Sequence, residues 1–133
     1  MRVNRSTGYA LLAVGYIAKN ADKKIIVSQD ISKHYDIAPE YLLKMLHELV
    51  RANVLRGKRG PRGGFSLAKP AAKITMLEII EAIEGPMTGQ LHLAEQAGTE
   101  KFSARAEQVY ERAVARAREV LARTKLSSLI ESK

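Results

Sequence analysis

The sequence contains no cysteine and no tryptophan, and only 5% of its 133 residues are aromatic. The absence of cysteine excludes a disulfide framework, a thiolate zinc site, a cysteine nucleophile and a cysteine-ligated iron–sulfur cluster. Without tryptophan, a core must be built mainly from Leu, Ile, Val and Ala, which is feasible because 46% of the residues are hydrophobic. A chain of this length has room for one compact domain and one projecting element.

Long hydrophobic runs are also missing. No apolar stretch approaches the roughly 20 residues that a membrane-spanning helix needs. The N-terminal segment does not resemble a signal peptide, because Thr7, Gly8 and Tyr16 make a poor export core and no cleavage site follows. We therefore expect a cytoplasmic protein without a membrane partner.

Positive charge is concentrated in the first part of the chain. Residues 1–75 contain 14 Lys or Arg and 5 Asp or Glu, whereas residues 76–133 contain 8 and 9. The net charge of +8 therefore comes from the front half. A basic module joined to a neutral one is typical of polyanion binding, although a solvated surface with excess lysine gives the same totals.

Patterns for catalysis or metal binding are scarce. The three histidines, His34, His47 and His92, are scattered without ligand spacing. A metal site at His92 with Glu95 or Glu100 is a weaker alternative. The glycine-rich segment 57–64 lacks the Gly-Lys-Ser/Thr ending of a nucleotide loop and opens no helix. We therefore expect no enzyme, no bound metal and no cofactor.

The N-terminal region predicts two helices and a short strand. Apolar residues between Tyr9 and Ile17 recur at the spacing of one helical face. They are Tyr9, Leu12, Ala13, Tyr16 and Ile17. The β-branched run Ile25–Val27 predicts a strand of one or two pairings. Ser28 is expected to cap a second helix, in which Ile31 and Tyr35 share a face.

The third predicted helix is longer and basic. Asp36 is expected in the turn before it and Ile37 in the core, while Pro39 suits the first turn of the helix, where a missing N–H costs nothing. Its expected apolar stripe is Leu42, Leu43, Leu46, Leu49 and Val50, with Lys44, His47, Glu48 and Arg51 on other faces. Two helices joined by a brief turn, the second longer and basic, are typical of a helix-turn-helix.

A basic, glycine-rich segment follows directly. Val54–Leu55 and Phe65–Leu67 are predicted as short strands, and between them lie four glycines and one proline. Gly60-Pro61 and Gly63-Gly64 supply the dihedral angles that a hairpin tip needs. The same stretch holds four basic residues, Arg56, Lys58, Arg59 and Arg62. A basic hairpin after such a helix predicts a wing.

The next segment carries a nearly complete helix-start pattern. Thr75 and Glu78 match a capping box, and Ile74 and Ile79 match the hydrophobic staple around it. The helix is expected to end at Gly85-Pro86. Met87–Phe102 has a mixed composition and is expected to form a loop or a short-helix connection.

A long final helix is predicted from Ser103, as its cap, to about Thr124. Its apolar side consists of Val109, Ala113, Ala117, Val120, Leu121 and Thr124, widened by Tyr110 and Val114. The opposite face holds Arg105, Glu111, Arg112, Arg118 and Glu119, and Glu119 is spaced to pair with Arg123. With no second long helix left to cover it, the apolar side either folds back or pairs with a second copy. We favour a dimer through Val109, Ala113, Ala117, Val120 and Leu121.

Three motifs together resemble one family. They are Tyr41-Leu42 in the third helix, Arg56–Phe65 (RGKRGPRGGF) and Ile74–Gly85 (ITMLEIIEAIEG). The opening residues, from Met1-Arg2 to Tyr9-Ala10, fit as well. They resemble the Rrf-two family, the BadM-type bacterial regulators that include the iron–sulfur cluster regulator and the nitric-oxide-sensitive repressor. The likeness covers residues 1–86 in detail and 103–130 only in general character.

The resemblance implies a mainly α fold with a small β-wing. It implies a homodimer whose recognition helices enter successive major grooves of DNA while the wings reach into flanking minor grooves. Many relatives hold an iron–sulfur cluster through three cysteines between the fourth helix and the dimer helix. Gly85–Ser103 contains no cysteine here, so the usual cluster is excluded and the effector is left open as a small molecule or a protein.

Arg59 is the strongest DNA-binding candidate, because a guanidinium at a hairpin tip can enter a narrow minor groove; a solvated turn charge is the alternative. Arg56, Lys58 and Arg62 are expected at phosphates. Residues near the start of the third helix usually meet base edges. The candidates there are Ala38, Glu40, Tyr41 and Lys44, with Arg51 further along and Ser28 as a phosphate clamp or an ordinary cap.

Several of these helix residues have a second interpretation. Tyr41 is expected at a phosphate or as a half-buried ring, and Glu40 at a cytosine or at the helix N-terminus. Leu43 stands where relatives often have a polar side chain.

We therefore predict a winged helix-turn-helix regulator, with repression favoured over activation, that binds double-stranded DNA as a homodimer at a palindromic operator. Residues 1–86 form the DNA-binding domain, 87–102 a connecting segment that could sense a signal, and 103–133 the dimerisation helix and tail. One alternative is a winged-helix module that docks on a protein and binds nucleic acid only nonspecifically. Another is a small-ligand sensor for which DNA contact is incidental.

Overall fold

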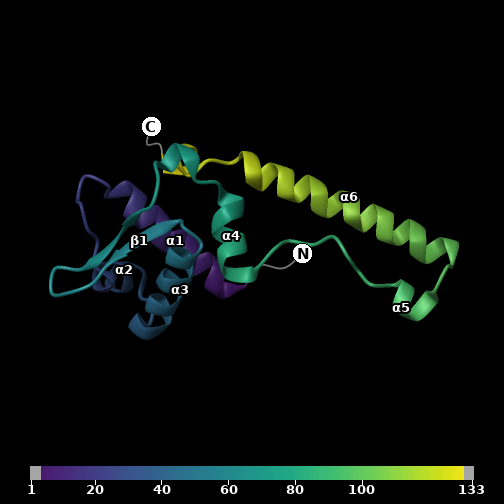
Figure 1. Ribbon diagram of the computed structural model, residues 1–133, viewed down its shortest axis with the longest axis horizontal. Helices are drawn as coiled ribbons and strands as arrows, with labels where there is room; N and C mark the ends of the chain where they lie inside the picture. Colours follow the sequence, from purple (N-terminus) through teal and green to yellow (C-terminus); the bar gives the residue numbers. More distant parts are fainter. Residues whose placement is uncertain (1–3, 131–133) are drawn as a thin grey trace.

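The computed structural model describes residues 4–130 and shows a helical head from which one long helix projects (Figure 1). The elements of the head are α1 (Arg5–Lys19), α2 (Ser28–Tyr35), α3 (Pro39–Arg51), β1 (Leu55–Lys58), β2 (Gly64–Leu67), η1 (Ala71–Lys73) and α4 (Met76–Glu84). They are followed by α5 (Ala94–Ala97), α6 (Lys101–Arg123) and α7 (Leu126–Ile130). The predicted fold class, mainly α with a small β-wing, is confirmed. Met1, Arg2 and the tail beyond Ile130 lie outside the described residues.

Helix α1 forms the centre of the head. Its small buried side chains let neighbouring helices approach closely. The buried residues are Thr7, Ala10, Ala13, Val14, Ile17 and Ala18. The prediction of a helix was right, but the predicted face was displaced, because Leu12 is 41% exposed. The apolar residues of α1 cover a wide arc of the helix surface. The packing of α3, α4 and α7 against α1 decides which part of this arc is buried.

Helices α2 and α3 form the predicted helix-turn-helix. Asp36 adopts the left-handed conformation between them, and the Ser32 hydroxyl donates to the Ile37 carbonyl at 2.6 Å. Pro39 occupies the first turn of α3. Two predictions were wrong here: Ser28 is the first residue of α2 and its side chain makes no capping bond, and Leu43 is exposed rather than part of the buried stripe.

The wing is an antiparallel pair in which Leu55 faces Leu67 and Lys58 faces Gly64. Ile26 adds a single bridge to Phe65, with backbone N–H donors and carbonyl acceptors exchanged at 2.9 and 2.8 Å. This confirms the short strand predicted at Ile25–Val27. Strand β2 therefore pairs with β1 on one side and with the segment at Ile26 on the other.

Helix α4 begins with the predicted capping box. The Glu78 amide donates to the Thr75 hydroxyl at 3.1 Å, and the Glu78 carboxylate accepts from the Thr75 amide at 3.4 Å. Ile74 and Ile79 are both fully buried in the core. The helix ends at Gly85, whose φ of 83° is in the region that favours glycine. The short helix α5 then interrupts the connection to α6, as expected.

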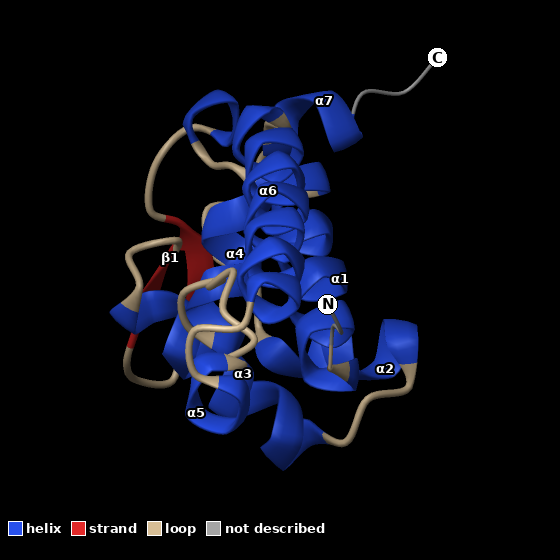
Figure 2. Cartoon of the chain, turned by 90° about the vertical axis from the view of Figure 1, so that its right-hand side faces the viewer, coloured by secondary structure: helices blue, strands red, loops and turns tan. Residues whose placement is uncertain are grey.

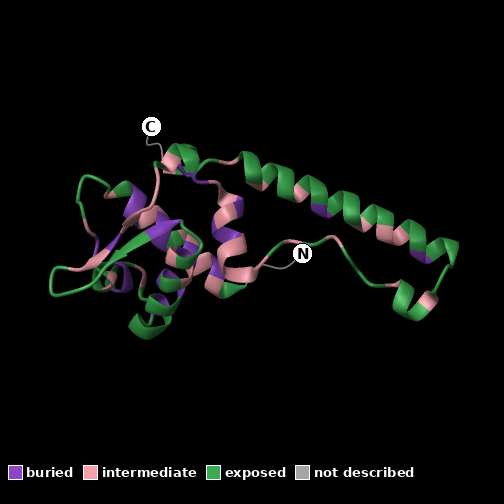
Figure 3. Ribbon diagram, viewed as in Figure 1, coloured by how far each residue is buried: buried purple, intermediate pink, exposed green. Residues whose placement is uncertain are grey.

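Helix α6 begins earlier than the sequence predicted. Ser103 lies inside its first turn, where its hydroxyl donates to the Glu100 carbonyl at 2.9 Å, so it is not the cap. The pairing of Glu119 with Arg123 is present at 2.8 Å. Figure 3 shows that most of this helix is exposed along its length.

Helix α7 was not predicted, and it returns the chain to the head. The Leu126 amide donates to the Ile74 carbonyl at 2.8 Å, and the Met76 amide donates to the Thr124 carbonyl at 2.9 Å. Leu126 is buried in the core of the head. These contacts anchor the C-terminal end of α6 at the start of α4 while its N-terminal end extends away (Figure 1).

Candidate nucleic-acid interface

The first two turns of α3 present a mixed polar surface to solvent. The residues predicted to contact DNA there are all exposed, namely Ala38, Glu40, Tyr41 and Lys44. The opposite side of the helix is fixed by Leu42, Leu46 and Leu49, which are completely buried. Because the buried stripe fixes the rotation of the helix, it also fixes the exposed side chains as one face.

Tyr41, for which the sequence left a phosphate contact or a half-buried ring open, contacts α1 in this structure. Its hydroxyl is hydrogen-bonded to the hydroxyl of Ser6 on α1, and its ring packs edge-on against Tyr9 with centroids 5.8 Å apart. The residue nevertheless remains exposed. The start of α3 is thereby held against α1, and the phenolic group stays at the surface.

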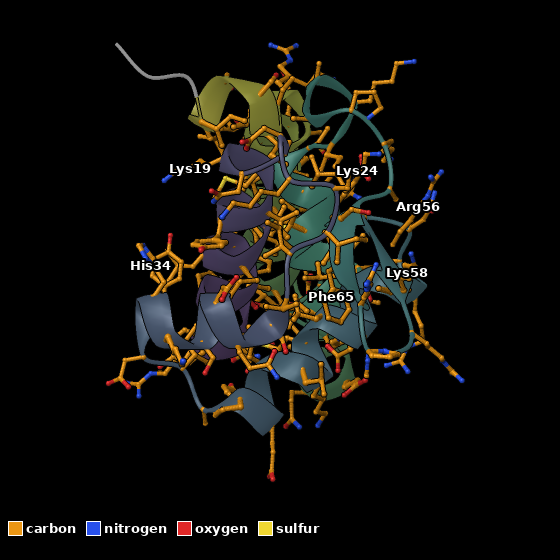
Figure 4. All side chains as sticks on the ribbon, turned by 90° about the vertical axis from the view of Figure 1, so that its left-hand side faces the viewer. Lys19, Lys24, His34, Arg56, Lys58 and Phe65 are labelled. Atoms are coloured by element: carbon orange, nitrogen blue, oxygen red, sulfur yellow. The ribbon has the colours of Figure 1, made fainter. Side chains whose placement is uncertain are left out.

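The side chains of β1 alternate between the inner and the outer face of the wing. Leu55 is buried, and Gly57 lies next to the ring of Phe65, so these positions of β1 face inward. Arg56 and Lys58 alternate with them and are exposed. Figure 4 shows both side chains reaching away from the head on the same side.

The wing tip depends on glycine. Gly60 has a φ of 104°, and a Cβ at Gly63 would lie 2.1 Å from the Lys58 carbonyl oxygen. The Gly63 amide donates to the Gly60 carbonyl at 2.9 Å and closes the turn. Arg59 and Arg62 lie exposed in this turn. Within residues 4–130, none of the wing cations forms an ion pair, so they are available to an anionic partner.

The remaining predicted residues flank this surface. Arg51 is exposed at the C-terminal end of α3. Ser28 is half-buried, and its hydroxyl makes no capping bond. Lys24, which the sequence analysis did not select, is a further exposed cation outside the predicted set. It precedes the strand segment that pairs with β2, and it lies on the wing side of the head in Figure 4. The run Lys23-Lys24 before a strand was the available signal.

Helix α6 divides the predicted apolar stripe into a covered and an uncovered part. Val114 is buried, and Arg118, which was assigned to the opposite face, bonds Glu81 of α4 at 3.1 Å. Val109 and Val120 remain 55% and 64% exposed. Ala113 is also exposed, whereas Ala117 and Leu121 are half-buried. Phe102, which the stripe did not include, is 81% exposed. Figure 2 looks along this helix and shows the head behind it.

Carboxylates organise the segment between α4 and α6. Glu107 of α6 accepts from the amides of Leu93 at 2.7 Å and Leu91 at 3.2 Å, and these bonds hold the pKa of its carboxyl below the usual value. Glu81 accepts from the Met87 amide at 2.8 Å. His92 lies 4.0 Å from Glu95 on the exposed surface. Among residues 4–130, no three His, Asp or Glu side chains are grouped as metal ligands.

No helix among the described residues combines the length and apolar character needed to cross a membrane.

The sequence model of the Rrf2 family, described as iron-dependent transcriptional regulators, matches residues 3–132. The chain is 39% identical to BadM of Rhodopseudomonas palustris over 106 residues, which are 80% of this chain and 65% of BadM. It is 34% identical to the regulator IscR of Cereibacter sphaeroides over 86 residues, 63% of this chain and 56% of IscR. The chain thus spans about half to two thirds of the curated relatives that it matches.

Solved structures show the same fold. Oxidised CymR of Staphylococcus aureus superimposes with a TM-score of 0.79 at 25% identity, covering 100% of this chain and 98% of CymR. CymR of B. subtilis, a global cysteine regulator, gives 0.83 at 24% identity, covering 98% and 96%. These matches extend over α6 and α7 as well as the head. This cysteine-free chain belongs to the Rrf2 family of DNA-binding transcriptional regulators, a family of regulators rather than enzymes.

Proposed function

We propose that this chain is a homodimeric repressor that binds a palindromic operator without an iron–sulfur cluster. The observation that carries the proposal is the uncovered apolar stripe on α6. Val109, Ala113 and Val120 recur at helical spacing on an element that projects from a basic head. Such a stripe on a soluble helix is covered when two copies pair.

Pairing through α6 gives the operator its symmetry. Two identical heads related by a two-fold axis read two inverted half-sites. The centres of these half-sites are expected one or two helical turns apart, one turn being roughly 34–36 Å. The predicted interface residues are Val109, Ala113, Ala117, Val120 and Leu121, and Phe102 extends the stripe toward the N-terminal end of α6.

Each head offers two kinds of DNA contact. The exposed face at the start of α3 is placed for the major groove, where Lys44 can donate to guanine and Glu40 can accept from a cytosine amine. Arg59 at the wing tip is assigned to the minor groove. The phosphate contacts are assigned to Ser28, Tyr41, Arg51, Arg56, Lys58 and Arg62, while Ala38 packs against the groove.

Repression follows from occlusion. A dimer that spans about two helical turns of a promoter excludes the transcription machinery sterically, whereas activation requires an additional specific contact. The basic head binds tightly enough for this role only where phosphate contacts and base contacts combine.

The family is described as iron-dependent, but the residues of this chain do not fit an iron–sulfur cluster. Three thiolates would be needed between α4 and α6, and the sequence has none. The segment after α4 is instead held by carboxylates, since Glu81 accepts from the Met87 amide and Glu107 from the amides of Leu91 and Leu93. We propose that residues 87–102 connect the DNA-binding domain (1–86) to the dimerisation helix and tail (103–133). Ordering of this segment would then set the spacing of the two heads.

Selection of the purified protein on a random-sequence duplex library at near-physiological salt tests the proposal. An enriched palindrome with half-sites one or two turns apart is expected. Retention of DNA without an enriched sequence, lost steeply as salt rises, would contradict it and favour a module that docks on a protein partner.

A further inference from the structure

A cavity of about 550 Å³ lies on the head away from the exposed face of α3. Its walls come from the end of α1, the loop before the Ile26 bridge, the end of β2, η1 and α7. The apolar lining is entirely aliphatic, with Ile17, Ile26, Leu67 and Ile130 as its largest members. Pockets of this size with a mostly apolar lining are typical of small-molecule sites.

The charged side chains of the described lining all have one sign. Lys23, Lys24 and Lys69 line it, and none of the described lining residues is acidic. Lys69 is already paired with Glu78 at 2.7 Å. Lys23 and Lys24 form no ion pair within residues 4–130 and are exposed at the rim. Ser66 is the only other polar residue of the described lining.

We infer that this cavity binds a small aliphatic carboxylate. Its hydrocarbon body would lie against Ile17, Ile26 and Ile130, and its carboxylate would lie beside the ammonium groups of Lys23 and Lys24. The absence of aromatic side chains from the described lining favours a flexible aliphatic body over a flat ring that needs stacking partners. The two lysine ammonium groups are point charges and lack the two-pronged geometry of an arginine guanidinium, which suits a monoanion.

The position of the cavity gives such a ligand a route to the DNA-binding surface. Leu67 belongs to β2 of the wing, Ile26 to the segment that bridges β2, and Ile130 to the helix that follows α6. A ligand between them stabilises one placement of the wing relative to the dimer helix. This regulatory step rests on the proposed function, whereas the binding site does not.

Octanoate is a suitable probe, and the isoleucine methyl groups report its position. In methyl NMR spectra of the full chain without DNA, octanoate is expected to shift Ile17, Ile26 and Ile130 saturably. Ile31 and Ile37, which are buried in the helix-turn-helix, should not move. Octylammonium has the same chain with the opposite charge and should not bind. No saturable shift, shifts that spread to Ile31 and Ile37, or equal binding of octylammonium would overturn the inference.

Two double variants distinguish a specific role of Lys23 and Lys24 from an effect of the overall positive charge of the protein. Lys23→Gln/Lys24→Gln is expected to weaken octanoate binding about three- to tenfold, because each exposed pair contributes modestly. Lys33→Gln/Lys101→Gln removes the same charge from exposed positions outside the lining and should leave the affinity unchanged. An equal loss of octanoate affinity in both double variants would indicate nonspecific charge attraction and would overturn the proposed site.

The regulatory step has its own measurement. Saturating octanoate is expected to change the affinity for the selected operator at least threefold in the wild-type chain and not in Lys23→Gln/Lys24→Gln. If octanoate left the operator affinity unchanged while the methyl shifts persisted, the proposed coupling between ligand and DNA would be overturned. The ligand-binding site itself would stand. Failure to select any operator would contradict the proposed function while the methyl shifts still decide the binding site.

Discussion

The ring of Phe65 on β2 lies 6.0 Å from the ring of His47 on α3, measured between centroids. The backbone of the same phenylalanine exchanges two hydrogen bonds with Ile26. Phe65 is 7% exposed and packs in the core of the head. One residue therefore fixes the wing relative to α3 and to the strand segment before α2.

Replacing Phe65 with Ala is expected to lower the free energy of unfolding by about 3–5 kcal/mol, because it removes a buried ring and leaves a cavity at the base of the wing. Urea denaturation followed by circular dichroism measures this loss. Phe65→Leu fills more of the space and should cost less. Equal stability of Phe65→Ala and the wild type would show that the wing packs independently of the core.

Arg59→Ala is expected to weaken specific DNA binding by about 1–3 kcal/mol, since the tip guanidinium is assigned to the minor groove. Fluorescence anisotropy on the selected operator and on a scrambled duplex gives both affinities. Arg62→Ala, a second exposed arginine of the same turn, should weaken the two duplexes alike and reduce the salt slope by about one. The assignment fails if Arg59→Ala behaves in the same way as Arg62→Ala.

Val120→Asp is expected to weaken the dimer by at least about 2 kcal/mol, or roughly thirtyfold in Kd, because it places a charge in the apolar stripe of α6. Sedimentation velocity over a range of concentrations measures the dimer. Operator affinity should fall far more than nonspecific affinity. Ala122→Asp adds the same charge nearby on another exposed part of the helix and should leave the dimer intact. An unchanged sedimentation coefficient in Val120→Asp would refute pairing through α6.

The order of residues 87–93 is expected to depend on acid pH through Glu107. Because amide donors lower the pKa of this carboxyl in the folded chain, its contribution is complete above the usual value of about 4.5 and is lost as the pH falls through the lower folded value. Amide hydrogen exchange at Leu91 and Leu93, corrected for intrinsic rates, should show protection at pH 7 and pH 5 and less near pH 3. Glu107→Gln should already reduce protection at pH 7, and equal protection in the variant would contradict this role.

The sequence by itself determined the local elements of this protein. The capping box at Thr75 and Glu78, the proline at the start of α3 and the glycines of the wing tip each satisfy a backbone requirement within a few residues. The same is true of the pairing between Glu119 and Arg123 along α6. Local requirements of this kind can be read without knowing the partner elements, and so the helix-turn-helix and wing were predictable.

The tertiary structure decided which part of each apolar arc is buried. Leu12 and Leu43 fit helical stripes but face outward, and Arg118 reaches Glu81 from a face that the pattern had left to solvent. Helix α7 and the aliphatic cavity also emerged only from the fold, because they join segments far apart in the chain. Helical periodicity fixes angles around one axis, whereas burial depends on where other elements pack, and that information lies in the whole chain.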